Sequence, residues 1–177
     1  MTVTASAIAL GSNVGDSLAT LRAAISALEA HAQVTVTVAS SVYLTKPLGP
    51  PQPDIFNACI LLETTLTAPE LLNLLLAIET TFERVRSQHW GPRTLDLDLL
   101  LFGQQVLSTP TLQLPHPRMW QRGFVLVPLA EIAPNWHNPI SGQTIAEISA
   151  VVGDAGVERL RDAPPLLSRP TGRSVVG

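Results

Sequence analysis

Residues 95–103 read LDLDLLLFG, a strand whose apolar end must be buried and whose first half carries two aspartates. Side chains two residues apart in a strand point the same way, so Asp96 and Asp98 share a face about 6–7 Å apart. The alternating leucines then take the opposite face and can pack on helices. A carboxylate is almost never buried unless it is paired, and two close carboxylates repel each other. The strand therefore needs cations beside its polar face.

Two kinds of cation could meet this need. Mg²⁺ prefers oxygen ligands and is usually held by one or two carboxylates together with substrate phosphates. Two such ions could lie on either side of a phosphate chain. The structural alternative is that salt bridges to arginines neutralise Asp96 and Asp98. The flanking sequence favours the metal site, because Arg93 lies three residues before Asp96 and follows a tight turn at Gly91–Pro92.

The charges of the chain are unevenly distributed. Eleven basic against fourteen acidic residues give a net charge of −3, which argues against a general nucleic-acid binder. Residues 84–122 nevertheless hold five arginines against two acids, Asp96 and Asp98. Arginine suits bidentate binding of phosphate oxygens, so this window predicts an anion site. The sequence has no G-x-x-x-x-G-K-[ST] loop, so metal and arginine would have to hold any nucleotide.

Several features predict a cytoplasmic protein. No stretch reaches the roughly 18–20 apolar residues of a membrane span, and the first basic residue is Arg22, unlike the start of a signal peptide. Cys59 is the single cysteine, so the chain has no internal disulfide. We expect Cys59 to be a small buried hydrophobe and the tryptophans Trp120 and Trp136 to be packing residues.

Apolar periodicity predicts the order β-α-β-β-α-β, followed by further helices. Asp16 should cap the first helix, and the capping box Thr67–Glu70 should open the second. This order resembles the α+β, ferredoxin-like (split βαβ) arrangement, an antiparallel sheet with helices mainly on one face. The other face would be free for a site. We expect one domain over residues 1–160 and a flexible C-terminal tail over 161–177, which is polar, rich in proline and aperiodic.

Four segments, in order along the chain, resemble one enzyme family. The segment HWGPRTLDLDLL (89–100) is similar to the signature of the 6-hydroxymethyl-7,8-dihydropterin pyrophosphokinases of the folate pathway. The other segments are ALGSN (9–13), YLTKPLGPPQPDIFNA (43–58) and LPHPRMWQRGFVLVPLAEIAP (114–134). The resemblance covers residues 8 to about 150.

The resemblance implies a reaction and its machinery. The hydroxymethyl oxygen of the dihydropterin would attack the β-phosphorus of ATP, so that pyrophosphate is transferred and AMP leaves. Asp96 and Asp98 would hold two Mg²⁺ ions that bridge the triphosphate. Arg84 and Arg93 would neutralise charge that develops during transfer. The positions matched to ATP contacts are Glu79, Arg86, Arg93, His116 and Arg122.

The same resemblance implies a pterin site. Trp90 and Phe124 would sandwich the flat ring, and Asn57 would read its donors and acceptors. The remaining pterin-binding positions are Thr45, Pro47 and Leu48. Four residues depart from the family pattern, near the pterin or near ATP: Ile55, Leu76, Thr111 and Pro117.

Two other functions remain open on the sequence. One is a different metal-dependent nucleotidyl or phosphoryl transferase, since paired aspartates on such sheets also occur in polymerase palms. The other is a ligand-binding regulatory module, which would have little use for the aspartate pair together with Arg93. We expect a monomer that acts on two small molecules, ATP and the dihydropterin, with no nucleic-acid or membrane partner.

Overall fold

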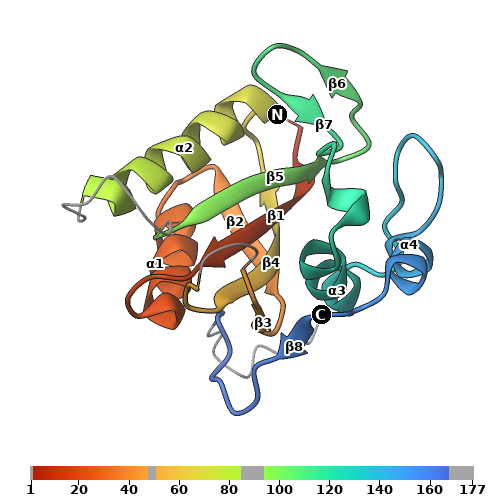
Figure 1. Ribbon diagram of the computed structural model, residues 1–177. Coiled ribbons are helices and arrows are strands. Elements are labelled where there is room, and N and C mark those ends of the chain that lie inside the picture. Colours follow the sequence, from red (N-terminus) through yellow and green to blue (C-terminus); the bar gives the residue numbers. More distant parts are fainter. Residues whose placement is uncertain (1, 48–50, 85–93, 168–177) are drawn as a thin grey trace, which may run out of the picture.

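The computed structural model describes residues 2–47, 51–84 and 94–167 (Figure 1). The helices are α1 (Ser17–Glu29), α2 (Ala68–Arg84), α3 (Gly123–Ile132) and α4 (Ile145–Val152), with a 3₁₀ turn, η1 (Met119–Gln121). The strands of the main sheet are β1 (Thr4–Ser12), β2 (Val34–Ala39), β3 (Tyr43–Thr45), β4 (Ile55–Thr64), β5 (Asp96–Phe102) and β8 (Val157–Arg159). A separate pair is formed by β6 (Leu107–Ser108) and β7 (Gln113–Leu114). No helix in these ranges is long and apolar enough to cross a bilayer.

The main sheet is antiparallel throughout the described ranges, in the order β5-β1-β4-β3-β8, with β2 also paired to β4. The predicted α+β, ferredoxin-like fold class is confirmed. The second strand of the predicted order is broken, however, into β2 and β3. The break occurs at Ser40, whose N–H donates to Cys59 O at 2.9 Å and whose hydroxyl accepts the Cys59 N–H at 2.9 Å.

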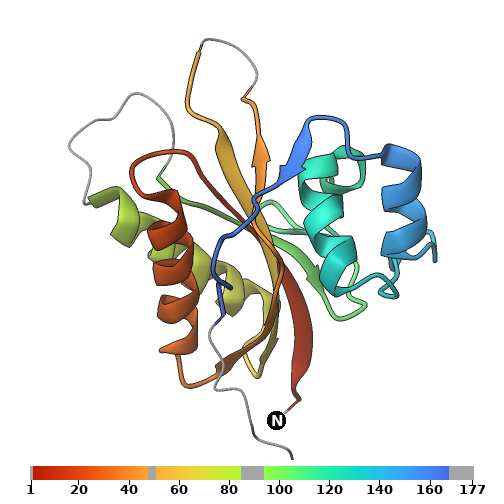
Figure 2. The same cartoon turned by 90° about the horizontal axis from the view of Figure 1, so that it is seen from below.

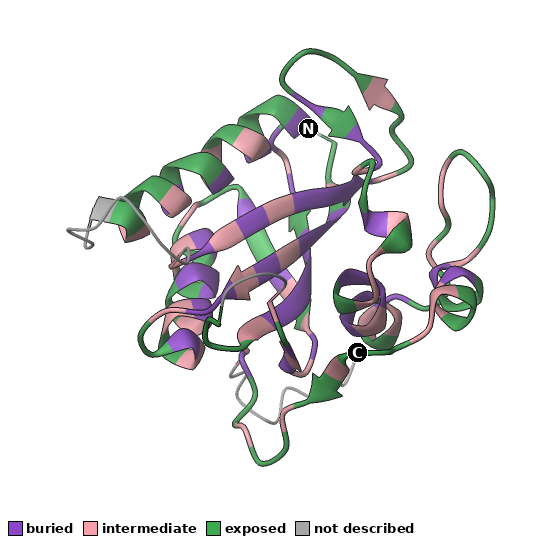
Figure 3. Cartoon of the chain, in the orientation of Figure 1, coloured by how far each residue is buried: buried purple, intermediate pink, exposed green. Residues whose placement is uncertain are grey.

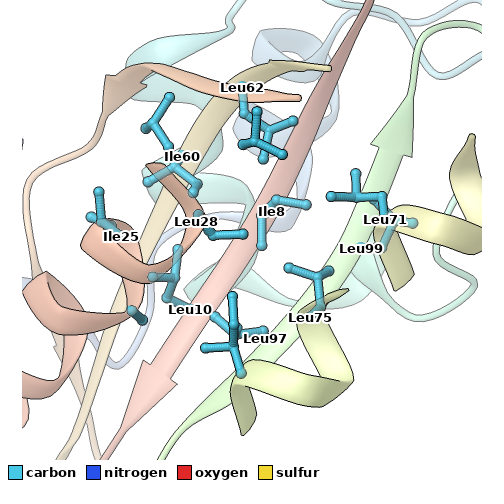
Figure 4. Packing of buried hydrophobic residues seen from close by; sticks show 14 of the residues in the cluster. Ile8, Leu10, Ile25, Leu28, Ile60, Leu62, Leu71, Leu75, Leu97 and Leu99 are labelled. Carbon is cyan, nitrogen blue, oxygen red and sulfur yellow. The ribbon is translucent and has the colours of Figure 1, made fainter. Parts of the chain in front are cut away.

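The first two helices begin where their capping residues predict. Asp16 accepts the Ala19 N–H at 3.1 Å, and Thr67 and Glu70 exchange hydrogen bonds at 2.9 and 3.3 Å. Both helices pack on the same face of the sheet, and Figure 4 shows their leucine and isoleucine side chains meeting those of the strands. The residues labelled there are Ile8, Leu10, Ile25, Leu28, Ile60, Leu62, Leu71, Leu75, Leu97 and Leu99.

The second face of the sheet is half covered, which corrects the expectation that it would be free. Figure 2 shows α3 and α4 on the side opposite α1 and α2. A register shift in the β1–β5 pairing, between Ala7 and Ile8, places both Leu100 and Leu101 on this face, where they join Cys59 under α3. Trp120 and Trp136 pack against the same cluster, as predicted. The uncovered half of this face carries the two aspartates.

The C-terminal segment packs on the domain as far as the structure describes it. β8 pairs with β3, and the Leu160 N–H donates to Val42 O at 2.8 Å. Arg22 then donates to Pro164 O at 3.2 Å, and Leu166 is only 6% exposed, within the core under α1 and α2. The segment 161–177, expected to be a flexible tail, thus holds packed residues up to 167, and 168–177 lie outside the described residues.

This packing predicts a stability role for the C-terminal segment. We expect Leu166→Ala to lower the free energy of unfolding by about 2–4 kcal/mol, because it removes apolar surface from the core and leaves a cavity. Urea denaturation measures the effect. The matched control is Leu76→Ala, which deletes the same atoms from a side chain that is 49% exposed. Equal losses in the two variants would mean that Leu166 does not contribute to the core in solution.

Candidate active site

The floor of the candidate site is formed by β5 and β1. Asp96 and Asp98 are half-buried and lie on one face of β5, where they are paired across the sheet with Gly11 and Ala9. Figure 3 shows buried and half-buried residues alternating along this end of β5. Because the neighbouring strand presents nothing larger than a methyl group beside them, the two carboxylates have room for ligands. The sequence did not lead us to Ala9 and Gly11 as the residues that leave room beside the aspartates. Small residues at alternate positions of a buried strand nevertheless indicate an open strip on one face of that strand.

Thr45 and Asn57, both predicted for the pterin, continue this floor on β3 and β4. The Thr45 hydroxyl donates to Asn57 Oδ1 at 2.7 Å, and both side chains are buried. Asn57 pairs with Gly11 across β1 and β4. A Cβ on Gly11 would lie 3.4 Å from Asn57 Nδ2, at van der Waals contact, so glycine leaves the space beside the amide open. The hydrogen bond from Thr45 holds the carboxamide in one orientation.

His116 stands at the rim of this floor, in the segment between β7 and η1. Its backbone N–H donates to Leu100 O at 2.9 Å, and its Nδ1 accepts the Arg118 N–H at 3.2 Å. Burial lowers the pKa of the imidazole below its usual range; Asp98 opposes this shift, and Arg122 and Arg118 add to it. A neutral imidazole whose Nδ1 accepts carries its proton on Nε2, so Nε2 is a hydrogen-bond donor.

Arg122 and Phe124 lie together at the start of α3. The Arg122 guanidinium is 5.6 Å from the centre of the Phe124 ring, within the range of a cation–π contact. Phe124 is 37% exposed, high for a large aromatic side chain, so its ring is accessible to a ligand.

A groove of about 460 Å³ runs along the outer side of β5, between α2 and the segment 109–117. Glu79 lines it, and Glu79 Oε2 accepts the backbone N–H of Leu97 at 2.9 Å. This bond falls between the two aspartates on a strand that forms the edge of the described sheet. Sequence reasoning did not find the groove's apolar wall, because it combines segments far apart in the chain: Leu72, Leu99, Pro110 and Leu112.

The four residues that depart from the family pattern all lie close to the candidate site. Leu76, Thr111 and Pro117 all line the groove, and Ile55 begins β4 beside the candidate pterin residues. Pro47 follows β3 and is half-buried. Arg84 ends α2, but its side chain lies outside what the structure describes, as do the predicted site residues Leu48, Arg86, Trp90 and Arg93.

The donor set fits Mg²⁺ bound with a phosphate-bearing substrate. Within the described ranges no three or more His, Cys, Asp or Glu side chains gather as a metal cage. Asp96 and Asp98 supply carboxylate oxygens on one face, beside small residues. Mg²⁺ is commonly bound through one or two carboxylates, while phosphate and water oxygens complete its octahedral shell.

Cys59 is fully buried on the same sheet face as this floor, under α3, as predicted, and its thiol lies 3.6 Å from Val125 O. Burial raises the pKa of the thiol far above its usual range, and Glu131 and Asp98 act in the same direction. An unfolded cysteine ionises near pH 8.5, so Cys59 favours folding fully below that pH and progressively less above it, by at most about 1.4 kcal/mol per pH unit.

We therefore expect the unfolding free energy to fall between pH 8 and pH 10, with a shallower fall in Cys59→Ala. Denaturant midpoints at several pH values measure both slopes. Parallel slopes in the two proteins would contradict a buried, protonated thiol.

Comparison with known proteins gives consistent matches. Residues 7–134 match the model of the family described as 7,8-dihydro-6-hydroxymethylpterin-pyrophosphokinase (HPPK). A Synechocystis protein named 2-amino-4-hydroxy-6-hydroxymethyldihydropteridine pyrophosphokinase is 50% identical over 141 residues, 80% of this chain and 72% of that protein. A Pseudomonas aeruginosa protein of the same name is 43% identical over 157 residues, 88% of this chain and 96% of that protein.

Solved structures agree at the level of the fold. A crystal structure of Plasmodium falciparum HPPK-DHPS superposes with a TM-score of 0.73 at 12% identity and covers 89% of this chain. This chain spans about half of that protein, 49% of its length. At such low identity the likeness shows the fold alone.

Proposed function

We propose that this chain, which belongs to the 7,8-dihydro-6-hydroxymethylpterin-pyrophosphokinase family, transfers pyrophosphate from ATP to 6-hydroxymethyl-7,8-dihydropterin with Mg²⁺ and releases AMP. Family membership makes the chain a pyrophosphokinase of folate biosynthesis. The hydroxymethyl oxygen attacks the β-phosphorus, the bond from that phosphorus to the AMP oxygen breaks, and the hydroxyl proton is released. We further propose that the protein acts as a monomer in the cytoplasm.

The observation that carries this proposal is that two groups of predicted site residues, one for the metal and one for the pterin, lie on one face of the sheet. Asp96 and Asp98 lie on β5. Asn57 lies two strands away on β4, hydrogen-bonded to Thr45 on the next strand, β3, and the small residues of β1 lie between Asn57 and the aspartates. The carboxylates would hold two Mg²⁺ ions. When bound, Mg²⁺ supplies charge neutralisation at the phosphate oxygens. The nucleophile and the phosphate chain would thus meet over β1.

The nucleotide would extend from the aspartates into the groove between α2 and the segment 109–117. The apolar lining there suits the face of a purine, and Glu79 stands beside it. His116 would donate from Nε2 to a phosphate oxygen, and Arg122 would add a positive charge. We assign the same phosphate region to Arg84, Arg86 and Arg93, with Arg84 and Arg93 stabilising charge in the transition state.

The pterin would lie between Phe124 and Trp90, over the polar end of β3 and β4. Asn57 presents Nδ2 there while Thr45 occupies its Oδ1, so the amide offers a fixed donor to the heterocycle. Pro47 and Leu48 would contact the ring from the chain that follows β3. Phe124 is accessible and begins α3, so its ring can stack on a flat ligand.

Analysis of the nucleotide product tests the proposal. The protein is incubated with 6-hydroxymethyl-7,8-dihydropterin, ATP and Mg²⁺, and we expect AMP and the pterin diphosphate in equal amounts. Formation of ADP would instead favour an ordinary phosphoryl transferase, and absence of turnover would favour a binding module. Omission of Mg²⁺ and omission of the pterin are the controls.

A further inference from the structure

Three hydrogen-bond donors converge on the carboxylate of Glu131, near the end of α3. Its oxygens accept the Ser41 N–H at 2.9 and 3.1 Å, the Ser41 hydroxyl at 3.1 Å and the Tyr43 hydroxyl at 2.6 Å. Glu131 is exposed at the rim of a cavity of about 710 Å³, but Tyr43 is buried. We call these contacts of Glu131 with Ser41 and Tyr43 the Glu131 clamp. The clamp attaches the end of α3 to the chain that enters β3.

The chain that receives the clamp is itself fixed to the sheet. Ser40 bonds to Cys59 of β4 through both its N–H and its hydroxyl, each at 2.9 Å. Tyr43 pairs with Asn57 across β3 and β4. Two residues after Tyr43, Thr45 donates to Asn57 Oδ1. The clamp therefore connects α3 to the same strands that hold the candidate pterin amide.

Helix geometry relates the position of Glu131 to that of Phe124 at the start of α3. Phe124 and Glu131 are seven residues apart, which is about two turns, so they lie on one side of the helix roughly 10 Å apart along its axis. Pro128 is inside α3 and has no N–H, so it cannot donate to the Phe124 carbonyl four residues earlier. The first turn is thus less constrained by the helix itself. A contact that fixes the rotation of α3 at Glu131 also fixes the direction of Phe124.

We propose that Glu131 and Tyr43 are positioning residues that set Phe124 at its place relative to Asn57, and thereby determine the affinity for a flat, polar heterocycle between them. This rests on the proposed function, because the heterocycle is the dihydropterin. The clamp acts on the pterin and not on the nucleotide, since the groove beside β5 contains none of its residues. Burial and the bond to Glu131 raise the pKa of Tyr43, so its hydroxyl remains a donor at neutral pH.

Equilibrium binding in four variants tests the proposal. Affinity for 6-hydroxymethyl-7,8-dihydropterin is measured with Mg²⁺ and a non-hydrolysable ATP analogue present, and affinity for the analogue is measured alone. The variants are Glu131→Gln, Tyr43→Phe, their double mutant and Phe124→Ala. The matched control is Glu147→Gln, an exposed carboxylate on α4. The amide NMR signals of Phe124 and Val125 are recorded for each variant without any ligand.

We expect Glu131→Gln to weaken pterin binding about tenfold, because the glutamine amide nitrogen cannot accept from Ser41 and the charge is lost. Tyr43→Phe should add little in the Glu131→Gln background. Affinity for the ATP analogue should change by less than about twofold, and the Phe124 amide signal should shift in Glu131→Gln but not in Glu147→Gln.

Three results for Glu131→Gln would contradict the proposal that the clamp positions Phe124. They are an unchanged Phe124 amide signal, a pterin affinity equal to that of Glu147→Gln, and a parallel loss of both affinities with a lower melting temperature. Failure of the proposed function is a separate result, in which the wild-type chain binds no dihydropterin. In that case the NMR signals alone test whether the clamp positions Phe124.

Discussion

Replacing Asp96 or Asp98 with asparagine is expected to reduce turnover about a thousandfold or more, equivalent to roughly 4 kcal/mol in the barrier. Asparagine has the same shape but no charge, so the face of β5 loses half of its attraction for Mg²⁺. Steady-state turnover at several Mg²⁺ concentrations measures the effect. The fold should be retained, because both side chains are only half-buried.

The control for this experiment is Glu63→Gln, an exposed carboxylate on β4 that pairs with Ala5, far from the aspartates along β1. It should leave turnover unchanged. The melting temperature of the aspartate variants should be equal to or above that of the wild type, since a repulsive pair has been neutralised. Near-normal turnover in either aspartate variant would show that the two carboxylates do not hold the metal.

Glu79→Ala is expected to cause the second-largest loss, about 10- to 100-fold in turnover at fixed Mg²⁺. The Leu97 N–H would lose its charged acceptor, a bond worth about 1.5–3 kcal/mol, and β5 would be less firmly held between its aspartates. Glu79→Gln keeps an oxygen that can accept, so it should retain most of the activity. The concentration of Mg²⁺ needed for half-maximal turnover should rise in the alanine variant.

Glu83→Ala, one turn further along α2 and exposed, is the control for a general effect on the helix. Equal losses in Glu79→Gln and Glu79→Ala would show that the charge of Glu79, and not its hydrogen bond to β5, is what the reaction needs. In that case Glu79 would act on the nucleotide directly.

The family signature located the candidate site residues along the chain, and the structure shows which of them are neighbours. Thr45 and Asn57 are hydrogen-bonded, Arg122 and Phe124 are in contact, and Asp96 and Asp98 share a face. Their roles stay predictions. Glu79 and Glu131 show the limit of sequence reading, because their carboxylates bind backbone or hydroxyl donors 18 and up to 90 residues away in the chain. A lone glutamate in the apolar run LAEIAP is visible in the sequence, but its partner is not.

The sequence by itself determined the local features of this protein. The caps at Asp16 and Thr67, the burial of Cys59, and the shared face of the aspartates follow from interactions within a few residues or from residue type. The tertiary structure alone decided the break between β2 and β3, the position of α3 on half of the second face, and the burial of Leu166. These three features depend on which apolar surfaces pack together and which backbone groups form hydrogen bonds across the sheet. Such contacts join segments that are far apart in the chain, so they produce no periodic pattern in the sequence.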